Sequence, residues 1–263
     1  MFGKLFSALA ARRASAAPSA DFDPDRLRPE TPLCIIGDLH GRLDLLEAML
    51  ALVAGQPDAE AVRLIFVGDM IDRGPDSAGV LRHLHGLCSR VPERVICLRG
   101  NHERMFLDFL ADPVGQGPRW LNAGGSETLS SFGLGQRVPG RSAADRFQAL
   151  AGALREALPP ARLAWLSGLP LYWQEDELAV THAGADPARA IAEQTERALL
   201  WGHPDFTRHS RRDGIWVAHG HVVLPEPRIR DGRISVDTGA WRSGRLSAAW
   251  IDAGGLRFLE ARI

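Results

Sequence analysis

The chain has 263 residues, of which 45% are hydrophobic and 24% charged, a balance typical of a soluble globular protein. Its formal net charge of −1 argues against a protein that mainly coats nucleic acid or an acidic membrane, because both tasks need a basic surplus. The 3 cysteines have no CxxC spacing, so neither a disulfide framework nor a thiolate zinc site is expected, and a reducing compartment, the cytoplasm, is the expected location.

Residues 1–30 are expected to form a flexible leader, because the Ala-, Ser- and Pro-rich tract after Arg13 has no periodicity. The apolar segment 5–11 is interrupted by Arg12 and Arg13 and is at the lower length limit of a signal-peptide core, which argues against a signal peptide. An amphipathic helix at residues 1–9 that touches a membrane is the minority interpretation. No stretch approaches the roughly 20 apolar residues that span a bilayer, so no membrane span is expected. Residues 31–263 are expected to form a single domain.

From Pro32 onward, short apolar runs alternate with longer segments of helical periodicity. Continuous apolar runs are typical of strands buried on both faces, and the expected strands are residues 33–36, 64–67 and 95–98. Helices are expected between them, at 42–52 and 76–87, the second capped by Asp76 or Ser77. Since helical crossovers imply parallel pairing, the chain is expected to open as β-α-β-α-β.

The middle of the chain, residues 112–170, is helical and turn-rich, with helices expected at 142–157 and around 160–166. Because this segment lacks strand-like runs, we expect a cap or insertion beside the sheet. Strand-like runs return at residues 169–173, 178–181, 215–218, 234–236 and 248–251. The last of these are short and accompanied by turn signals such as Asp231-Gly232, which favours antiparallel pairing.

Polar side chains follow five of the expected strands at the point where each strand ends. In chain order they are Asp38 and His40, Asp69, Asn101 and His102, His182, and His219 and His221. Because ligands bind at the carboxyl edge of open α/β sheets, these residues predict one common site. Carboxylates, a carboxamide and imidazoles without thiolate suit Mn²⁺, Fe, Mg²⁺ or Zn²⁺. The set exceeds the needs of one tetrahedral ion, so two metals sharing a carboxylate are expected, as in sites that activate water and clamp phosphoryl oxygens.

Three motifs carry a family resemblance. Gly37-Asp38-Leu39-His40-Gly41, the GDMIDRG of residues 68–74 and the GNHE of residues 100–103 resemble the GDxHG, GDxxDRG and GNHE signatures of the phosphoprotein phosphatase (PPP-type) branch of the calcineurin-like metallophosphoesterases. His182-Ala183-Gly184 and Gly220-His221 resemble the later histidine motifs, and residues 237–240 resemble a closing segment of bacterial members. The resemblance implies an α/β fold of two packed mixed β-sheets flanked by helices, a four-layer αββα sandwich with a helical cap insertion.

The resemblance also implies roles for individual residues. It predicts a dinuclear metal centre that activates a hydroxide, with Mn²⁺ as the leading metal and Asp69 bridging the two ions. The predicted metal ligands are Asp38, His40, Asp69, Asn101, His182 and His221. His102, held by Asp72, would protonate the leaving oxygen, since imidazole titrates in the range that an alkoxide leaving group needs. Arg73 and Asn101 would hold phosphate oxygens. The guanidinium fork of Arg73 has the right shape for this contact.

The chain departs from the family pattern at one position. Members usually supply another phosphate-binding arginine shortly after a tryptophan, between the two late histidine motifs, but Trp201 is followed by residues 202–205 without arginine. A substitute would have to come from the same loop, and the candidates are Arg208, Arg211 and Arg212.

Several neighbouring residues have simpler interpretations. His219 is two residues before His221 and would point to the opposite strand face, so we expect it to support the core. Glu103 and Arg99 flank Asn101 and are expected to be structural partners. Trp120 and Trp241 are the tryptophans in glycine-rich surroundings that could line the cleft.

The leading functional hypothesis is a metal-dependent phosphomonoesterase acting on phosphoserine, phosphothreonine or phosphotyrosine of a phosphoprotein, or on a small phosphorylated substrate. The alternative is symmetrical hydrolysis of dinucleoside polyphosphates, performed by a sister branch that usually has aspartate after GNH and lacks the Asp-Arg pair. Asp72-Arg73 and Glu103 therefore favour the monoesterase. A non-catalytic binding module would have lost a ligand or the acid, and this chain has lost none. No nucleic-acid binding is expected, and no sequence feature specifies an oligomeric state.

Overall fold

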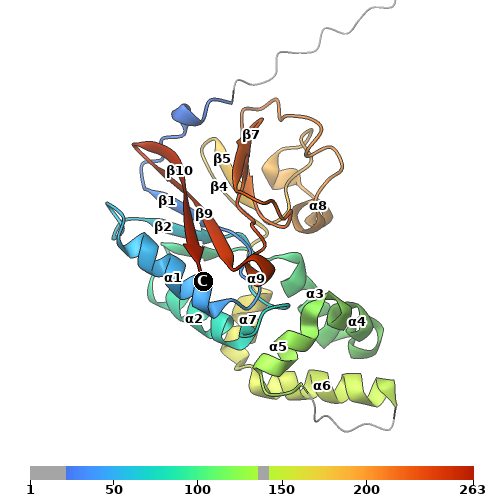
Figure 1. Ribbon diagram of the computed structural model, residues 1–263. Helices are drawn as coiled ribbons and strands as arrows, with labels where there is room; N and C mark the ends of the chain where they lie inside the picture. The colour runs from blue at the N-terminus through green and yellow to red at the C-terminus, as the bar shows by residue number, and fades with distance from the viewer. Residues whose placement is uncertain (1–21, 136–141) are drawn as a thin grey trace, which may run out of the picture.

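A computed structural model of the chain describes residues 22–135 and 142–263. Two five-stranded mixed sheets pack face to face, with helices outside them (Figure 1). The first sheet contains, in spatial order, β10 (Gly255–Arg262), β9 (Arg245–Asp252), β1 (Leu33–Ile36), β2 (Arg63–Phe66) and β3 (Val95–Cys97). The second contains β4 (Tyr172–Glu175), β5 (Leu178–Thr181), β6 (Trp216–His219), β8 (Arg233–Ser235) and β7 (Arg228–Arg230).

The opening β-α-β-α-β is confirmed. β1 pairs in parallel with β2, and β2 with β3, through α1 (Leu43–Ala54) and α2 (Ser77–Arg90). The predicted cap of the second helix is Asp76, whose side chain accepts the N–H of Gly79 at 2.7 Å. Because the three strands run in the same direction, their carboxyl ends lie at one edge of the sheet.

The strands predicted from continuous apolar runs are covered on both faces, as expected. Leu33 and Ile35 of β1 pack between the two sheets, whereas Cys34 and Ile36 face the helices on the other side. Alternate side chains of a strand point to opposite faces, so a strand covered on both faces needs apolar residues throughout. The outer face of the second sheet is covered in part by η3 (Ile191–Glu193) and by the loop after α8 (Glu196–Trp201).

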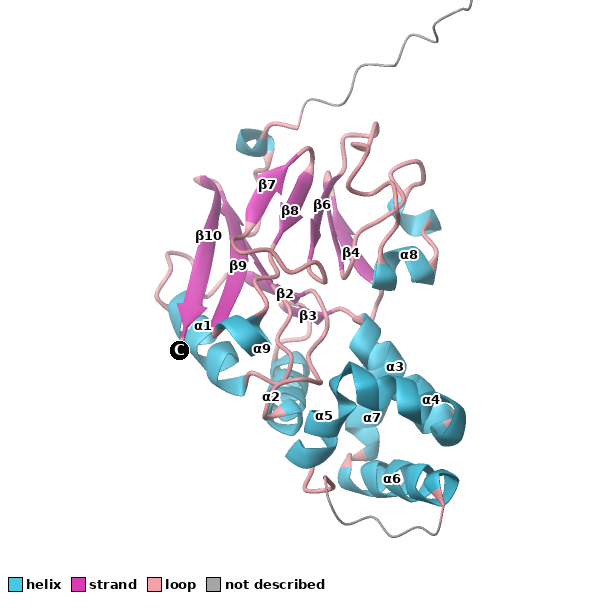
Figure 2. Cartoon of the chain, turned by 45° about the vertical axis from the view of Figure 1, so that its right-hand side comes forward, coloured by secondary structure: helices cyan, strands magenta, loops and turns pink. Residues whose placement is uncertain are grey.

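The described residues between 101 and 167 form a helical lobe beside the sheets (Figure 2). Its elements are α3 (Asn101–Ala111), α4 (Pro113–Trp120), η2 (Leu121–Gly125), α5 (Ser126–Ser131), α6 (Ala143–Ala157) and α7 (Pro160–Ser167). Within the described part of 112–170 no strand is present, as expected. Trp120 and Leu154 of this lobe belong to the same buried cluster as Phe66 of the first sheet, so lobe and sheet share a core.

The later strands agree only in part with the expectation. β9 is antiparallel to both its neighbours, but β8 is parallel to β6 and antiparallel only to β7. β4 begins three residues later than predicted, at Tyr172. β7 and β10 were not predicted, because β7 consists of two exposed arginines around Ile229 and β10 is a half-buried edge strand without a strong apolar run.

The structure describes only part of the predicted leader, residues 1–30. Residues 1–21 lie outside the described residues, but residues 22–30 pack on the body of the protein around η1 (Pro24–Arg26). The ring of Phe22 stands edge-on to that of Trp216, with centroids 5.2 Å apart, and Leu27 is buried between the sheets. In the described ranges, no helix has the length and apolar character needed to span a membrane.

Candidate metal centre

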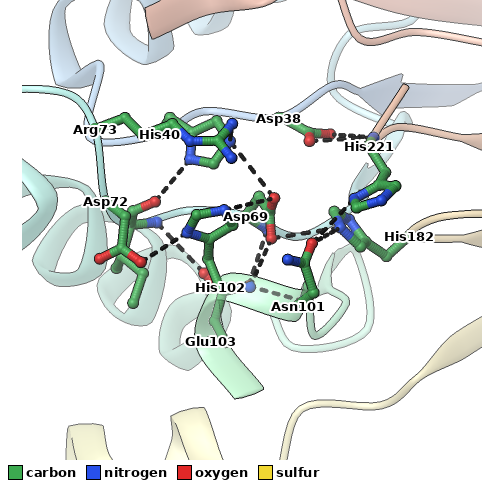
Figure 3. Close-up of polar contacts among 12 residues, drawn as sticks. Asp38, His40, Asp69, Asp72, Arg73, Asn101, His102, Glu103, His182 and His221 are labelled. Atoms are coloured by element: carbon green, nitrogen blue, oxygen red, sulfur yellow. Dashed lines mark hydrogen bonds and ion pairs between the residues drawn. The ribbon is translucent and has the colours of Figure 1, made fainter. Parts of the chain in front are cut away.

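The predicted site residues converge at the carboxyl edge of the sheets (Figure 3). They come from the loops that follow β1, β2, β5 and β6 and from the first turn of α3, which follows β3. Two groups of possible ligand atoms lie within 4.8 Å of one another: His40, Asp69 and His102 form one, and Asp69, His182 and His221 the other. Asp69 is common to both, which is the position that a ligand shared between two ions requires.

The other two predicted ligands lie against these groups. Asn101 Oδ1 is 2.8 Å from His182 Nε2 and 3.0 Å from His221 Nδ1. The carboxylate of Asp38 is buried and accepts the backbone N–H of His221 at 3.1 and 3.2 Å. All the predicted ligands are therefore brought together, whereas the chain positions that supply them are up to 183 residues apart.

The donor atoms fit divalent cations. His182 Nδ1 lies 3.1 Å from the carbonyl oxygen of Val67 and donates its proton there. Burial lowers the pKa of His182 to about 4, so the ring is neutral and the Nε2 lone pair faces Asn101 Oδ1. Two lone pairs that face each other repel unless a cation accepts both. A hydrogen bond from the other ring nitrogen to a backbone carbonyl oxygen is a usual way to orient a metal-binding histidine.

His40 is oriented in the same way. Its Nδ1 donates to the carbonyl oxygen of Ile71 at 2.8 Å, and its Nε2 lies 3.5 Å from Asp69 Oδ2. Burial lowers the pKa of His40 to about 3, which leaves the Nε2 lone pair available at neutral pH. The N–H of Arg73 Nη1 donates to that lone pair at 3.0 Å.

The carboxylates give the site an excess of buried negative charge. Burial raises the pKa of Asp38 well above its usual range, and the nearby charges of Asp237 and Asp69 raise it further. Burial likewise raises the pKa of Asp237 to about 6, with a further contribution from Asp69. Two divalent cations would neutralise this charge, so the electrostatics as well as the donor types favour metal binding. Asp237 was not among the predicted site residues, and its only sequence signal was the closing motif.

The backbone around the site is strained. Eight non-glycine residues in the described ranges have positive φ, and five of them are His40, Asp69, Asp72, Arg73 and His221. Such conformations cost about 1–3 kcal/mol each and persist only where the surroundings impose them.

Glu103 holds the Asp69 loop in this conformation. Its buried carboxylate accepts the N–H groups of Gly100 at 2.7 Å, Asp69 at 2.9 Å and Met70 at 2.8 Å. A Cβ on Gly100 would lie 2.2 Å from Asp69 Oδ1, so only glycine fits there. Glu103 thus has the structural role that the sequence indicated.

The side chain of His102, the predicted proton donor, is held in place by its neighbours. His102 Nδ1 donates to Asp72 Oδ2 at 2.7 Å, and Asp72 also accepts the hydroxyl of Thr128 at 2.7 Å and Nε1–H of Trp120 at 3.1 Å. Burial acts to lower the pKa of His102, but Asp69 and the hydrogen bond to Asp72 outweigh it and raise that pKa above its ordinary value. His102 Nε2 lies 3.9 Å from Asp69 Oδ2, on the side of the metal groups.

Two tryptophans that could line the cleft have different positions. Trp120 is completely buried and donates a hydrogen bond to Asp72, so it does not line the cleft. Trp241 is exposed and lies beside Arg73. His219 is buried, with Nδ1 on the carbonyl oxygen of Gly220 and Nε2 on Ser235 Oγ, which is a supporting position.

The three candidates for a second phosphate-binding arginine lie elsewhere. Arg211 is buried and binds Asp213 and the carbonyl oxygens of Asp186 and Arg189. Arg208 and Arg212 line a separate surface pocket that contains none of the predicted site residues. The loop after Trp201 therefore does not replace the missing arginine.

The two packed mixed sheets and the paired histidine–aspartate groups at their edge define a metallophosphoesterase, a hydrolase of phosphoric esters. The sequence profile of the calcineurin-like phosphoesterases matches residues 31–225, and the chain belongs to that family. The family fold predicted from the motifs is thus confirmed.

Curated relatives of similar length match most of the chain. The asymmetrical bis(5′-nucleosyl)-tetraphosphatase PrpE of Halalkalibacterium halodurans is 27% identical over 242 residues, which cover 81% of this chain and 87% of the relative. The protein of the same name from Bacillus subtilis is 27% identical over 249 residues, covering 86% and 90%.

Solved structures with the same fold include enzymes of two kinds. A protein serine/threonine phosphatase from Saccharomyces cerevisiae with similarity to human phosphatase PP5 has a TM-score of 0.60 at 16% identity, covering 89% of this chain and 81% of its own. A provisionally assigned diadenosine tetraphosphatase has a TM-score of 0.57 at 23% identity, covering 88% and 94%.

Proposed function

We propose that the chain hydrolyses dinucleoside tetraphosphates at a dinuclear metal centre. The observation that carries this proposal is the similarity, over 81–86% of the chain, to relatives named asymmetrical bis(5′-nucleosyl)-tetraphosphatases. Asp72-Arg73 and Glu103 had favoured a phosphomonoesterase, but the relatives favour the alternative hypothesis, and in its asymmetrical rather than its symmetrical form.

The predicted ligands Asp38, His40, Asp69, Asn101, His182 and His221 would hold two divalent cations, which supply Lewis-acid stabilisation of phosphoryl oxygens and lower the pKa of water. Arg73 would bind oxygens of the scissile phosphoryl group with its guanidinium fork. Asn101 and His102 stand in the first turn of α3, where the helix dipole favours a phosphate anion. His102 would donate its Nε2 proton to the leaving oxygen, and Asp72 would stabilise the imidazolium through Nδ1.

A second candidate, a phosphoprotein phosphatase, is favoured by the His102–Asp72 pair. An alkoxide of serine is a strong base and departs only with a proton, whereas a phosphate leaving group is a weak base and needs less assistance. His102 donates to the fully buried Asp72 at 2.7 Å, so the pair is a stronger proton-donating arrangement than phosphoanhydride cleavage alone requires.

One turnover panel separates the two candidates. With added Mn²⁺, the protein would be assayed on diadenosine tetraphosphate, on a phosphoserine peptide and on p-nitrophenyl phosphate, with Asp69→Asn as the control for contaminating phosphatases. We expect the highest kcat/KM on diadenosine tetraphosphate. Chromatography of the products identifies the bond cleaved, because addition of water gives ATP and AMP in the asymmetrical reaction and two ADP in the symmetrical one. A higher kcat/KM on the phosphopeptide would contradict the proposal and support the second candidate.

A further inference from the structure

An exposed tryptophan stands at the rim of the metal centre. Trp241 is 37% exposed and belongs to α9 (Ala240–Ser243), which follows the Asp237 segment. Val222, directly after the predicted ligand His221, is 43% exposed. Trp241 and Val222 are two of the five large apolar side chains that are exposed in the described ranges, and both belong to segments that adjoin the site residues.

The position of Trp241 relative to the predicted ligands is fixed. The short helix α9 lies between Gly239 and Gly244, both in the left-handed conformation with φ of 68° and 67°. Arg42, two residues after His40, donates from Nη1 to the carbonyl oxygen of Ala240 at 2.8 Å. The indole is therefore held on a rigid support tied to the loop that carries His40, as a preformed binding group requires.

Two guanidinium groups lie close to the ring of Trp241. The Cζ atom of Arg73 is 5.5 Å from the ring centroid, and that of Arg242 is 5.8 Å from it. Arg73 Nη1 also donates to Nε2 of the predicted ligand His40 at 3.0 Å, so the Arg73 guanidinium contacts both the indole and the metal centre. The positive charges of Arg73 and Arg242 both act to lower the pKa of Asp237, so Arg242, like Arg73, lies near this carboxylate of the site.

We propose that Trp241 and Arg242 form the subsite for the part of the substrate beyond the scissile phosphoryl group. The indole stacks on a nucleobase, and Arg242 binds oxygens of the phosphate chain between that base and Arg73. An aromatic face accepts any base, and an arginine fork matches phosphate, so together they recognise a nucleoside polyphosphate rather than a phosphate alone. This inference rests on the proposed dinucleoside tetraphosphatase activity and adds the residues that recognise the nucleotide.

A merely structural role for Trp241 makes a different prediction. If the indole only positioned Arg73, its removal would weaken every phosphate substrate equally, because Arg73 contacts the phosphoryl group that they share. If it stacks on a base, only substrates with a base are affected. The base is remote from the reacting phosphorus, so the loss should be in KM and leave kcat nearly unchanged.

The test compares substrates with and without a base in matched variants. Diadenosine tetraphosphate and inorganic tripolyphosphate would be assayed with Trp241→Ala, Trp241→Phe and Arg242→Ala. The control is Trp173→Phe, because Trp173 forms a similar pair with Arg63, at 5.6 Å, away from the site. Binding of ATP, measured by calorimetry, gives a readout independent of turnover.

For Trp241→Ala we expect a KM for diadenosine tetraphosphate raised about 5- to 150-fold, the range of a lost base–aromatic stack. The KM for tripolyphosphate should stay unchanged, Trp241→Phe should restore most of the affinity, and Arg242→Ala should weaken both substrates. Equal losses on both substrates in Trp241→Ala would overturn the subsite while leaving the proposed function intact. Absence of diadenosine tetraphosphate turnover by the unaltered protein would overturn the proposed function and the subsite together.

Discussion

Replacing Glu103 by glutamine tests how the Asp69 loop is held. Glu103 Oε2 accepts the N–H groups of Gly100 at 2.7 Å and Asp69 at 2.9 Å, and Oε1 accepts those of Met70 at 2.8 Å and Ile71 at 3.3 Å. A carboxamide can accept on one side only, so its NH₂ group would face two N–H donors. The variant therefore keeps the shape of the side chain and removes two hydrogen bonds to a charged acceptor.

The expected loss follows from these contacts. Hydrogen bonds to charged groups contribute about 1.5–3 kcal/mol each, so two give a decrease of roughly 3–6 kcal/mol in the free energy of unfolding. Burial and the neighbouring charge of Asp69 raise the pKa of Glu103 to about 7, so the charge of Glu103 is costly while Asp69 is unneutralised. The loss should therefore be larger in the Mn²⁺-loaded protein than in the metal-free protein.

Urea unfolding with and without Mn²⁺ measures both quantities. The control is Glu47→Gln, an exposed glutamate on α1, which should change the free energy of unfolding by less than about 0.5 kcal/mol. Because the Asp69 loop would relax, kcat/KM should also fall in Glu103→Gln. A Glu103→Gln protein as stable and as active as the control in both conditions would refute the role of Glu103.

Other parts of the site give further predictions. His102→Asn should keep its metal content but lower kcat about 10²–10⁴-fold on a phosphoserine peptide and less on p-nitrophenyl phosphate, and equal losses on the two would exclude His102 as the acid. Arg73→Ala should lower kcat/KM on both substrates by a similar factor, whereas a loss confined to one would contradict a contact with the shared phosphoryl group. Thermal stabilisation by Mn²⁺ should increase from pH 5 to pH 7.5, because Asp38 and Asp237 have raised pKa values, about 6 for Asp237, and must lose protons before they favour a cation. His182, with its pKa lowered to about 4, is already neutral at pH 5, so stabilisation that does not depend on pH would contradict this assignment.

The sequence was most informative where local pattern and burial coincide. The runs at 33–36, 64–67 and 95–98 are apolar throughout because both faces of those strands are covered, and the polar residues that follow them meet because parallel strands end at one edge. The later part of the chain was less predictable. β7 has a polar sequence and β10 lies at the edge of its sheet, so neither carries a strong apolar run.

The support of the site could not be read from the sequence. Trp120 and Thr128 reach Asp72 from 48 and 56 residues away, through helices whose arrangement no local pattern specifies. The positive φ of Asp69 and Arg73 likewise depends on tertiary contacts, such as the hydrogen bond from Arg73 N–H to the carbonyl oxygen of Gly124 at 3.1 Å. The proposed base-binding role of Trp241 likewise rests on neighbours that are known only from the fold.

The shared role of Asp69 is the central claim, and metal content tests it most directly. Elemental analysis after dialysis against Mn²⁺ should give about two ions per chain, as a dinuclear hydrolytic site requires. Asp69→Asn should retain fewer than one. Asp231→Asn is the matched control, because Asp231 has the same φ of 50° as Asp69 but lies exposed in the turn between β7 and β8, and it should retain the full content. Full metal content in Asp69→Asn, or a single ion in the unaltered protein, would contradict the account.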